Sequence, residues 1–164
     1  IIETQQDFLS VEMKEYSPAF ASCDTREVLS YLASYCQSFT FDASRTILVD
    51  PSSPTLRFST DLRILQRVMV NMIKNALEAA RPGEAVTLGC EQGEGGVVLW
   101  VRNNAVLPRE TKMRLFQKGY STKGSGRGFG TYSMRLFARQ CLGGDVDFES
   151  APETGTRFFL TLPG

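Results

Sequence analysis

The chain has 164 residues, of which 42% are hydrophobic, and this suits one globular domain with a sizeable core. Its eighteen basic and eighteen acidic residues cancel, so no basic excess exists to neutralise nucleic-acid phosphates or to bind a membrane surface. The chain contains no histidine, which excludes histidine acid–base catalysis, Ser-His-Asp triads and histidine metal ligands within it.

Four cysteines, Cys23, Cys36, Cys90 and Cys141, are too widely spaced for a metal-binding motif or a dense disulfide framework. We expect buried, reduced thiols of a cytosolic domain. No apolar run approaches about 18 residues, so no membrane-spanning segment is expected. Because the first residue is Ile1 rather than Met, we expect a fragment of a longer protein.

The periodicity of apolar residues predicts a series of helices and strands. In chain order they are a helix that ends near residue 15, a helix at 25–36 with Thr25 as N-cap, strands at 46–49 and 56–59, a helix at 61–81, strands at 85–91 and 96–103, a short helix at 110–116, a helix at 130–141, and strands at 145–150 and 156–162. The strands follow one another in pairs. This order predicts an α+β fold, a two-layer α/β sandwich whose mixed, mostly antiparallel sheet is covered on one face by about three helices.

The predicted helix at 61–81 has two distinct faces. Its apolar stripe consists of Leu62, Leu65, Val68, Met69, Met72, Ile73, Ala76 and Leu77. Asn71, Asn75 and Glu78 recur at the same three- and four-residue steps on another face. Such a polar row is usually a solvated face, and the remaining motifs decide whether it is a binding site instead.

A glycine-rich segment, STKGSGRGFGT at residues 121–131, leads directly into the predicted helix at 130–141. Glycines let backbone N–H groups approach an anion, and a helix N-terminus adds partial positive charge. The spacing fits neither a Walker loop, nor a dinucleotide fingerprint, nor a protein-kinase glycine loop. A flexible linker is the alternative, but the interleaved lysine, arginine and threonine residues favour a phosphate-binding loop.

Five motifs in this order resemble the ATP-binding domain of sensor histidine kinases. They are Asn71-x-x-x-Asn75-Ala, a strand ending in Asn103-Asn104, Leu115-Phe116, the glycine-rich segment, and Gly155-Thr156-x-Phe158. That domain belongs to the superfamily of DNA gyrase, the Hsp90 chaperone and MutL, and its Bergerat-type fold is an α/β sandwich. The resemblance covers about residues 45–164. It implies that residues 1–15 are the remnant of a dimerising, phosphoacceptor helix region and residues 16–164 the catalytic domain.

The resemblance also implies roles for single residues. Asn75 corresponds to the magnesium ligand, whose amide oxygen suits a hard cation that bridges phosphates. Asn71 stands where gyrase and the chaperone hold a glutamate that activates water, and an amide cannot take that proton at neutral pH. This favours phosphoryl transfer to a protein over hydrolysis. The implied catalytic residues are Asn71, Asn75 and Lys123, and the other implied ATP contacts are Lys74, Glu78, Asn103, Phe116, Lys118, Gly119, Ser121, Thr122, Gly124, Gly126, Arg127, Gly128, Phe129, Gly130, Thr131 and Thr156.

One segment departs from the family pattern. The family has Asp-x-Gly-x-Gly after the strand, and its Asp accepts a hydrogen bond from the adenine amino group. Here the segment reads Asn103-Asn104-Ala105-Val106-Leu107. The side-chain oxygen of Asn103 can accept that bond, but a neutral acceptor is weaker than a carboxylate. We therefore expect weaker ATP binding than in typical members, and an increase in affinity for Asn103→Asp.

The leading hypothesis is a catalytic domain that binds Mg²⁺ and ATP and transfers the γ-phosphoryl group to a histidine outside this chain. Its implied partners are the upstream phosphoacceptor helices, a second copy in the full-length dimer, and a response-regulator receiver domain. The implied location is the cytoplasm, as part of a bacterial sensor. Two alternatives are a superfamily ATPase or serine-directed kinase of the anti-sigma type, and a nucleotide-free pseudo-enzyme that serves as an interaction module.

Overall fold

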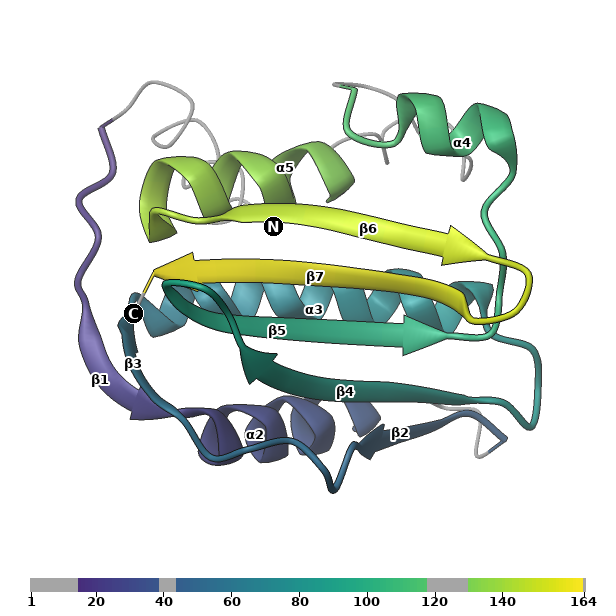
Figure 1. Cartoon of the computed structure of the whole chain (residues 1–164), viewed down its shortest axis with the longest axis horizontal. Helices are drawn as coiled ribbons and strands as arrows, with labels where there is room; N and C mark the ends of the chain where they lie inside the picture. The colour runs from purple at the N-terminus through teal and green to yellow at the C-terminus, as the bar shows by residue number, and fades with distance from the viewer. Residues whose placement is uncertain (1–14, 39–43, 118–129, 164) are drawn as a thin grey trace.

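The computed structural model describes residues 15–38, 44–117 and 130–163, and the predicted helix before residue 15 lies outside these ranges (Figure 1). The elements in chain order are β1 (Ala21–Asp24), α2 (Thr25–Gln37), β2 (Thr46–Val49), β3 (Arg57–Thr60), α3 (Leu62–Ala79), β4 (Ala85–Gln92), β5 (Gly96–Asn103), α4 (Arg109–Arg114), α5 (Gly130–Phe137), a π-helical turn η1 (Ala138–Leu142), β6 (Asp145–Ala151) and β7 (Gly155–Pro163).

The larger sheet has the strand order β2-β4-β5-β7-β6. β2 pairs with β4 in parallel, and the other neighbouring strands of this sheet pair antiparallel. Helices α2, α3 and α5 contact this sheet, and in Figure 1 α3 runs behind it. The predicted α+β sandwich with a mixed, mostly antiparallel sheet is therefore confirmed.

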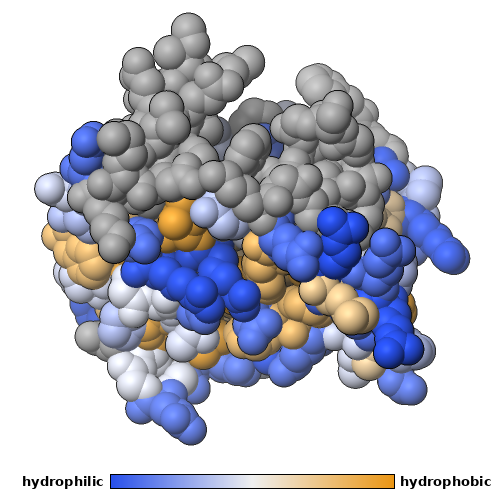
Figure 2. All heavy atoms as spheres, turned by 90° about the horizontal axis from the view of Figure 1, so that it is seen from above, coloured by the Kyte–Doolittle hydropathy of each residue, from blue (hydrophilic) through white to orange (hydrophobic). Residues whose placement is uncertain are grey.

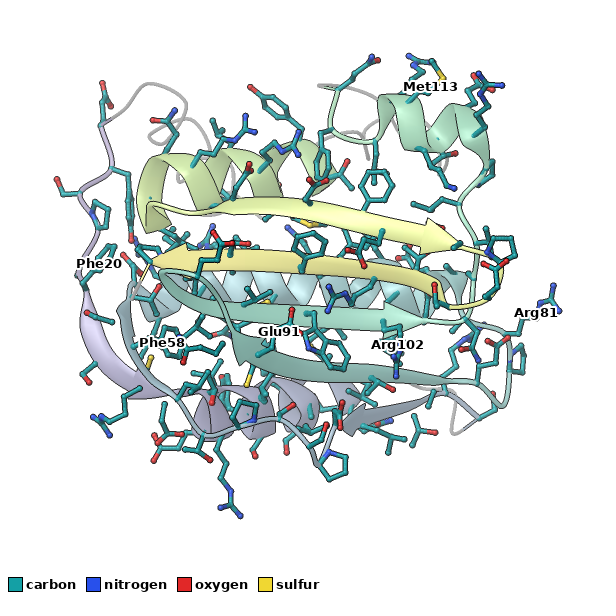
Figure 3. The ribbon with its side chains drawn as sticks, viewed as in Figure 1. Phe20, Phe58, Arg81, Glu91, Arg102 and Met113 are labelled. Atoms are coloured by element: carbon teal, nitrogen blue, oxygen red, sulfur yellow. The ribbon has the colours of Figure 1, made fainter. Side chains whose placement is uncertain are left out.

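The opposite face of the sheet, turned toward the viewer in Figure 3, carries Glu91 and Arg102. The guanidinium carbon of Arg102 lies 5.4 Å from the centroid of the Trp100 ring. The indole ring in turn covers Gly89, where an added Cβ would lie 2.0 Å from the ring. Arg157 forms an ion pair with Glu91 at 3.6 Å. Among the described residues, an aromatic ring under a charged group thus shields part of this face of the sheet.

α3 forms the centre of the helical layer. Asp61 caps its N-terminus by accepting hydrogen bonds from the backbone N–H groups of Arg63 and Ile64, each at 3.1 Å. The buried face consists of Ile64, Leu65, Val68, Met69, Met72, Ile73, Ala76 and Leu77. The predicted stripe is thus confirmed except at its first residue. Leu62, the first residue of the helix, is 44% exposed, and Ile64, which the predicted stripe did not include, is fully buried.

α2 begins with a different cap from the predicted one. Asp24, not Thr25, is the N-cap, and its carboxylate accepts from the backbone N–H of Glu27 at 2.8 Å. The Thr25 hydroxyl instead donates to the carbonyl of Pro54 at 2.8 Å and accepts from the backbone N–H of Leu56 at 2.9 Å. The prediction of Thr25 as N-cap was wrong because this fully buried hydroxyl bonds to the segment before β3.

β1 pairs antiparallel with β3 in a small two-stranded sheet that the sequence did not predict. The segment Ala-Ser-Cys-Asp shows little alternation of apolar and polar residues, so its strand conformation depends on pairing with residues far along the chain. The predicted strand at 56–59 is confirmed with a shift of one residue. The predicted helix at 110–116 is confirmed as α4 at 109–114.

The predicted helix at 130–141 is α-helical only as far as Phe137. The next five residues form the π-helical turn η1, and Gly143 ends it in the left-handed conformation at φ +70°. Position 144 requires a glycine because the backbone there passes close to β7. A Cβ there would lie 1.9 Å from the carbonyl oxygen of Thr161.

The four cysteines are buried and free, as the sequence predicted. Burial raises the pKa of the Cys36 thiol to about 11, although the charge of Lys74 opposes this. Burial likewise raises the pKa of Cys141 to about 11. Among the described residues, no helix is both long and apolar enough to cross a membrane.

Candidate functional site

The polar row on α3 lies away from the face that packs on the sheet. Asn71 and Asn75 are half-buried, while Lys74 and Glu78 are exposed. Arg67, one turn before Asn71, belongs to the same helical face and is half-buried. α3 also packs against α5, the helix that follows the glycine-rich segment.

The C-terminal end of β5 is bonded to α3 through Asn103. The side-chain amide of Asn103 donates to the carbonyl oxygen of Ala76 at 3.0 Å. Its oxygen accepts from the backbone N–H of Ala105 at 3.2 Å. With 6% of its surface exposed, Asn103 connects the strand to the residue next to Asn75. The predicted adenine contact and the predicted metal ligand are thus at the same end of the helix.

Thr156 lies opposite Asn103 in the β5–β7 register. Its hydroxyl donates to the carbonyl oxygen of Ala105 at 2.7 Å and lies 2.8 Å from the hydroxyl of Ser150. Gly155 precedes it at φ +76°, and a Cβ at this position would lie 2.1 Å from the carbonyl oxygen of Asn103. The motif Gly155-Thr156 therefore fits tightly around the chain that leaves β5, and Thr156 is buried rather than open to a ligand.

The two ends of the segment between α4 and α5 lie in contact. The hydroxyl of Thr131 donates to the carbonyl oxygen of Leu115. The guanidinium of Arg135 lies over the ring of Phe116 at 3.8 Å from its centroid. These two contacts place the predicted ATP contacts Phe116 and Thr131 in the same region of the fold. A third predicted contact, Gly130, is the first residue of α5.

Ten of the predicted ATP-binding residues lie outside the described residues. They are Lys118, Gly119, Ser121, Thr122, Lys123, Gly124, Gly126, Arg127, Gly128 and Phe129. Figure 2 shows the molecule from the side of α4 and α5, where hydrophilic side chains alternate with smaller hydrophobic areas among the described residues.

Some participants in this region were absent from the sequence-based site. Ser150 binds Thr156 and also accepts from the backbone N–H of Leu107 at 2.9 Å. Ser150 lies two residues after Phe148 on β6, so both side chains point to the same face of the sheet. The two-residue period of a strand could therefore have indicated Ser150 as part of this region. Arg135 could not have been found in this way, because a single arginine on a predicted helix gives no signal of a ring contact.

The side-chain oxygens near α3 can be compared with those that a magnesium ion requires. The described residues contain no cluster of three or more carboxylate, cysteine or histidine side chains that could hold a metal ion. Mg²⁺ bound with nucleotides usually takes only one or two protein oxygens and fills its remaining positions with phosphate oxygens and water. A single half-buried amide oxygen from Asn75 fits that pattern and would not hold the ion alone.

Comparison with known proteins points to one family. The profile of the family "Histidine kinase-, DNA gyrase B-, and HSP90-like ATPase" matches residues 60–164. Sensor protein DegM of Bacillus sp. (strain B21-2) is 28% identical over 160 residues, which are 96% of this chain and 41% of DegM. Sensor protein SrrB of Staphylococcus aureus is 26% identical over 113 residues, 65% of this chain and 19% of SrrB. This chain therefore spans less than half of either relative.

The fold has the same architecture as solved histidine kinases. The histidine kinase AdeS of Acinetobacter baumannii superposes with a TM-score of 0.78 at 15% identity, over 99% of this chain and 76% of that one. At such low identity the superposition supports the fold alone.

Proposed function

This chain belongs to the family of histidine kinase-, DNA gyrase B- and HSP90-like ATPases, and from this we propose that it is the ATP-binding catalytic domain of a sensor histidine kinase. The observation that carries the proposal is the bond from Asn103 to the carbonyl of Ala76, next to Asn75. This bond supports the proposal because it holds Asn103, the proposed adenine contact, beside the residue that follows Asn75, the proposed metal ligand. The nucleotide would extend from there along the polar face toward Asn71.

In the proposed reaction, the bond between the γ-phosphorus and the β,γ-bridging oxygen of ATP breaks. A bond forms to a ring nitrogen of a histidine outside this chain, which has none. The ring proton is released and ADP leaves. Mg²⁺ would neutralise the phosphate charge, with Asn75 as its protein ligand. Asn71 supplies an amide rather than a carboxylate, so this position has no base to activate water.

The remaining proposed contacts follow the chain around the nucleotide. Lys74 and Glu78 are exposed residues of α3, one beside Asn75 and the other one turn after it, and they are proposed to border the phosphates. Lys123, Arg127 and the glycines of the glycine-rich segment are proposed to bind the phosphates, and Phe116 and Thr131 stand at the two ends of that segment. Thr156 would act indirectly, because its hydroxyl bonds to the carbonyl of Ala105 beside Asn103.

The partners are also proposals. Residues 1–15 are proposed as the end of the phosphoacceptor helix region, and a receiver domain of a response regulator would take the phosphoryl group from it. The names of DegM and SrrB as sensor proteins support this context. The full-length protein would be a homodimer, with this domain in the cytoplasm.

Calorimetric titration of the chain with Mg-ATP tests the proposal. We expect binding, and its loss in Asn75→Ala with an unchanged circular dichroism spectrum. Gln66→Ala is the matched control, because Gln66 is also a half-buried polar residue of α3 but lines a groove with α2. Normal Mg-ATP binding by Asn75→Ala would show that the metal ligand is misassigned.

One observation favours a second candidate, an interaction module that binds no nucleotide. Both polar groups of the buried Asn103 side chain already have hydrogen-bond partners within the protein. A thermal-shift titration separates the two functions, since a ligand that binds only the native state raises the melting temperature. An unchanged melting temperature at millimolar Mg-ATP would favour the interaction module.

A further inference from the structure

The turn that follows Asn103 is bonded to side-chain hydroxyls of two neighbouring strands. The Thr156 hydroxyl of β7 donates to the carbonyl oxygen of Ala105 at 2.7 Å. The Ser150 hydroxyl of β6 accepts from the backbone N–H of Leu107 at 2.9 Å. The sheet therefore holds this turn at two places, at the carbonyl of Ala105 and at the N–H of Leu107.

The two hydroxyls also bond to each other, because their oxygens lie 2.8 Å apart. A hydroxyl has a single proton, and Thr156 gives its proton to Ala105. Ser150 must therefore be the donor between the two. Ser150 thus accepts from Leu107 and donates to Thr156, so the hydrogen bonds run without interruption from one backbone group of the turn to the other. We call Ser150 and Thr156 the hydroxyl pair.

The strand register places the hydroxyl pair in one row with Asn103. Thr156 of β7 lies opposite Asn103 of β5 and opposite Ser150 of β6. Residues directly opposite one another point to the same face of a sheet. Asn103 bonds to α3, so this is the face that carries the helices. The Nζ atom of Lys112 donates to the carbonyl oxygen of Ser150 at 3.0 Å and holds this end of the row.

The hydroxyl pair acts on the Asn103 side chain through Ala105. The backbone N–H of Ala105 donates to the Asn103 side-chain oxygen at 3.2 Å, and its carbonyl accepts from Thr156. Both Asn103 and Thr156 are buried, and a buried network is most rigid when each of its groups has a partner. The Asn103 oxygen has two lone pairs, so the bond from Ala105 leaves one of them for a ligand.

We propose that Ser150 is a positioning residue for the nucleobase. It fixes the turn after β5, and this turn keeps the Asn103 side-chain oxygen in one orientation. Ser150 does not need to touch the nucleotide. An acceptor whose orientation is already fixed loses less conformational freedom on binding, which raises affinity. This inference rests on the proposed function of Asn103 as the adenine contact.

Two substitutions at Ser150 separate the hydroxyl from the rest of the side chain. Ser150→Ala removes the hydroxyl, so the N–H of Leu107 loses its acceptor and Thr156 loses its donor. Ser150→Thr keeps the hydroxyl and suits a strand. Ser53→Ala is the matched control, because the half-buried Ser53 hydroxyl likewise accepts from a backbone N–H, that of Cys90 in β4 at 3.1 Å.

The test compares Mg-ATP with the magnesium complex of inosine triphosphate (Mg-ITP), whose base has an oxo group in place of the adenine amino group. The unsubstituted chain should bind Mg-ATP more tightly, because an oxo group cannot donate to the Asn103 oxygen. For Ser150→Ala, calorimetry should give a Kd for Mg-ATP about fivefold higher, the equivalent of one neutral hydrogen bond, and a nearly unchanged Kd for Mg-ITP. Ser150→Thr and Ser53→Ala should keep the preference for ATP.

The melting temperature of each variant without ligand distinguishes positioning from stability. A purely structural role of Ser150 would lower the melting temperature of Ser150→Ala and leave the ratio of its two Kd values unchanged, and this result would overturn the proposal.

Thr156→Val gives a second measurement, which also serves if Ser150→Ala does not fold. It removes the other member of the hydroxyl pair and should lower the preference for ATP by a similar factor. If the pair acts as a unit, the double variant should lose less Mg-ATP affinity than the sum of the two single losses. Additive losses, or an unchanged preference for ATP in Thr156→Val, would contradict the proposal.

The binding data of the unsubstituted chain separate this inference from the proposed function. If the chain does not bind Mg-ATP, both fail. If it binds Mg-ATP and Mg-ITP equally well, Asn103 is not the adenine contact and the inference fails with that assignment. If it prefers Mg-ATP and Ser150→Ala keeps the same preference, the inference alone fails.

Discussion

At the scale of single residues, Asn103 shows how one side chain combines a structural and a proposed binding role. Its amide group joins β5 to α3, and its oxygen supports the turn after β5. The sequence suggested only the second role, an acceptor for adenine. The donor role matters for any attempt to restore the aspartate that the family has at this position.

We predict that Asn103→Asp destabilises the ligand-free protein at neutral pH. The carboxylate would face the Ala76 carbonyl where the amide now donates, at a cost of about 1–3 kcal/mol in unfolding free energy. Burial and this carbonyl would raise the pKa of the new carboxyl in the folded state. The loss should therefore shrink as the pH falls and the carboxyl protonates.

Thermal melting at pH 7 and pH 4.5 checks this, with the exposed neighbour Asn104→Asp as the control. Equal melting temperatures of Asn103→Asp and the unsubstituted chain at pH 7 would contradict the structural role of the amide. Calorimetry on the same variant shows whether the stronger acceptor still increases ATP affinity.

The buried thiols give a prediction about alkaline pH. Burial raises the pKa values of Cys36 and Cys141 to about 11 in the folded chain, whereas an unfolded thiol titrates near about 8.5. Between these values the unfolded state loses the proton first, so the unfolding free energy falls by about 1.4 kcal/mol per pH unit for each thiol. Below this range the contribution is fully present.

Urea unfolding at several pH values between 8 and 11 measures the slope, and Cys36→Ala supplies the comparison. The variant should show a shallower decline by about the contribution of one thiol, even though its absolute stability is lower. Identical slopes for both proteins would show that Cys36 is not protected from ionisation in the folded chain.

At the scale of elements, the two aspartate caps differ in what they hold. Asp24 caps α2 and accepts one backbone hydrogen bond. Asp61 caps α3, is 3% exposed, and also accepts from the Tyr16 hydroxyl at 2.8 Å and the backbone N–H of Ala19 at 3.0 Å. Burial pushes the pKa of Asp61 upward, but these hydrogen bonds together outweigh it and hold the pKa below its ordinary value.

We therefore predict unequal effects of removing the caps. Asp24→Ala should cost about 1 kcal/mol of unfolding free energy. Asp61→Ala should cost about 2–4 kcal/mol, because it also leaves the hydroxyl of the half-buried Tyr16 and the backbone N–H of Ala19 without their acceptor. Urea denaturation of both variants measures the difference. Equal losses would mean that the contacts of Asp61 beyond the helix contribute little.

Elements with long periodic patterns were predictable from the sequence, and elements fixed by distant contacts were not. The helix at 61–81 was recognised because its apolar stripe extends over several turns. β1 was missed because its strand conformation depends on β3, and Asp24 was missed as a cap because the buried Thr25 hydroxyl has partners near Pro54. The π-helical turn after Phe137 has no signature in apolar spacing.

The candidate site likewise has features that the sequence indicated and contacts that it did not. The motif order indicated its proposed members, among them Asn75, Asn103 and Thr156, and their binding roles stay predictions. It did not predict that the Asn103 amide donates to Ala76, or that Arg135 stacks on Phe116. Such contacts depend on how elements pack in three dimensions, which spacing along the chain does not encode.

At the scale of the whole molecule, α3 connects the parts. Its apolar face packs in the core, and its polar face carries the proposed metal ligand. Its N-cap, Asp61, accepts a hydrogen bond from Tyr16, which precedes β1. The helices and the larger sheet share one continuous core. The molecule should therefore unfold as a single cooperative unit.

Two spectroscopic probes in different layers test this. Trp100, the single tryptophan, reports on β5 at the open face of the sheet, and far-UV circular dichroism reports mainly on the helices. We predict coincident urea transitions by the two probes. Saturating Mg-ATP should raise both midpoints equally, because a ligand of the native state stabilises the whole cooperative unit. Separate transitions would show that the sheet and the helical layer unfold independently. A shift of the helical midpoint alone on addition of Mg-ATP would show that the nucleotide stabilises only the helical layer.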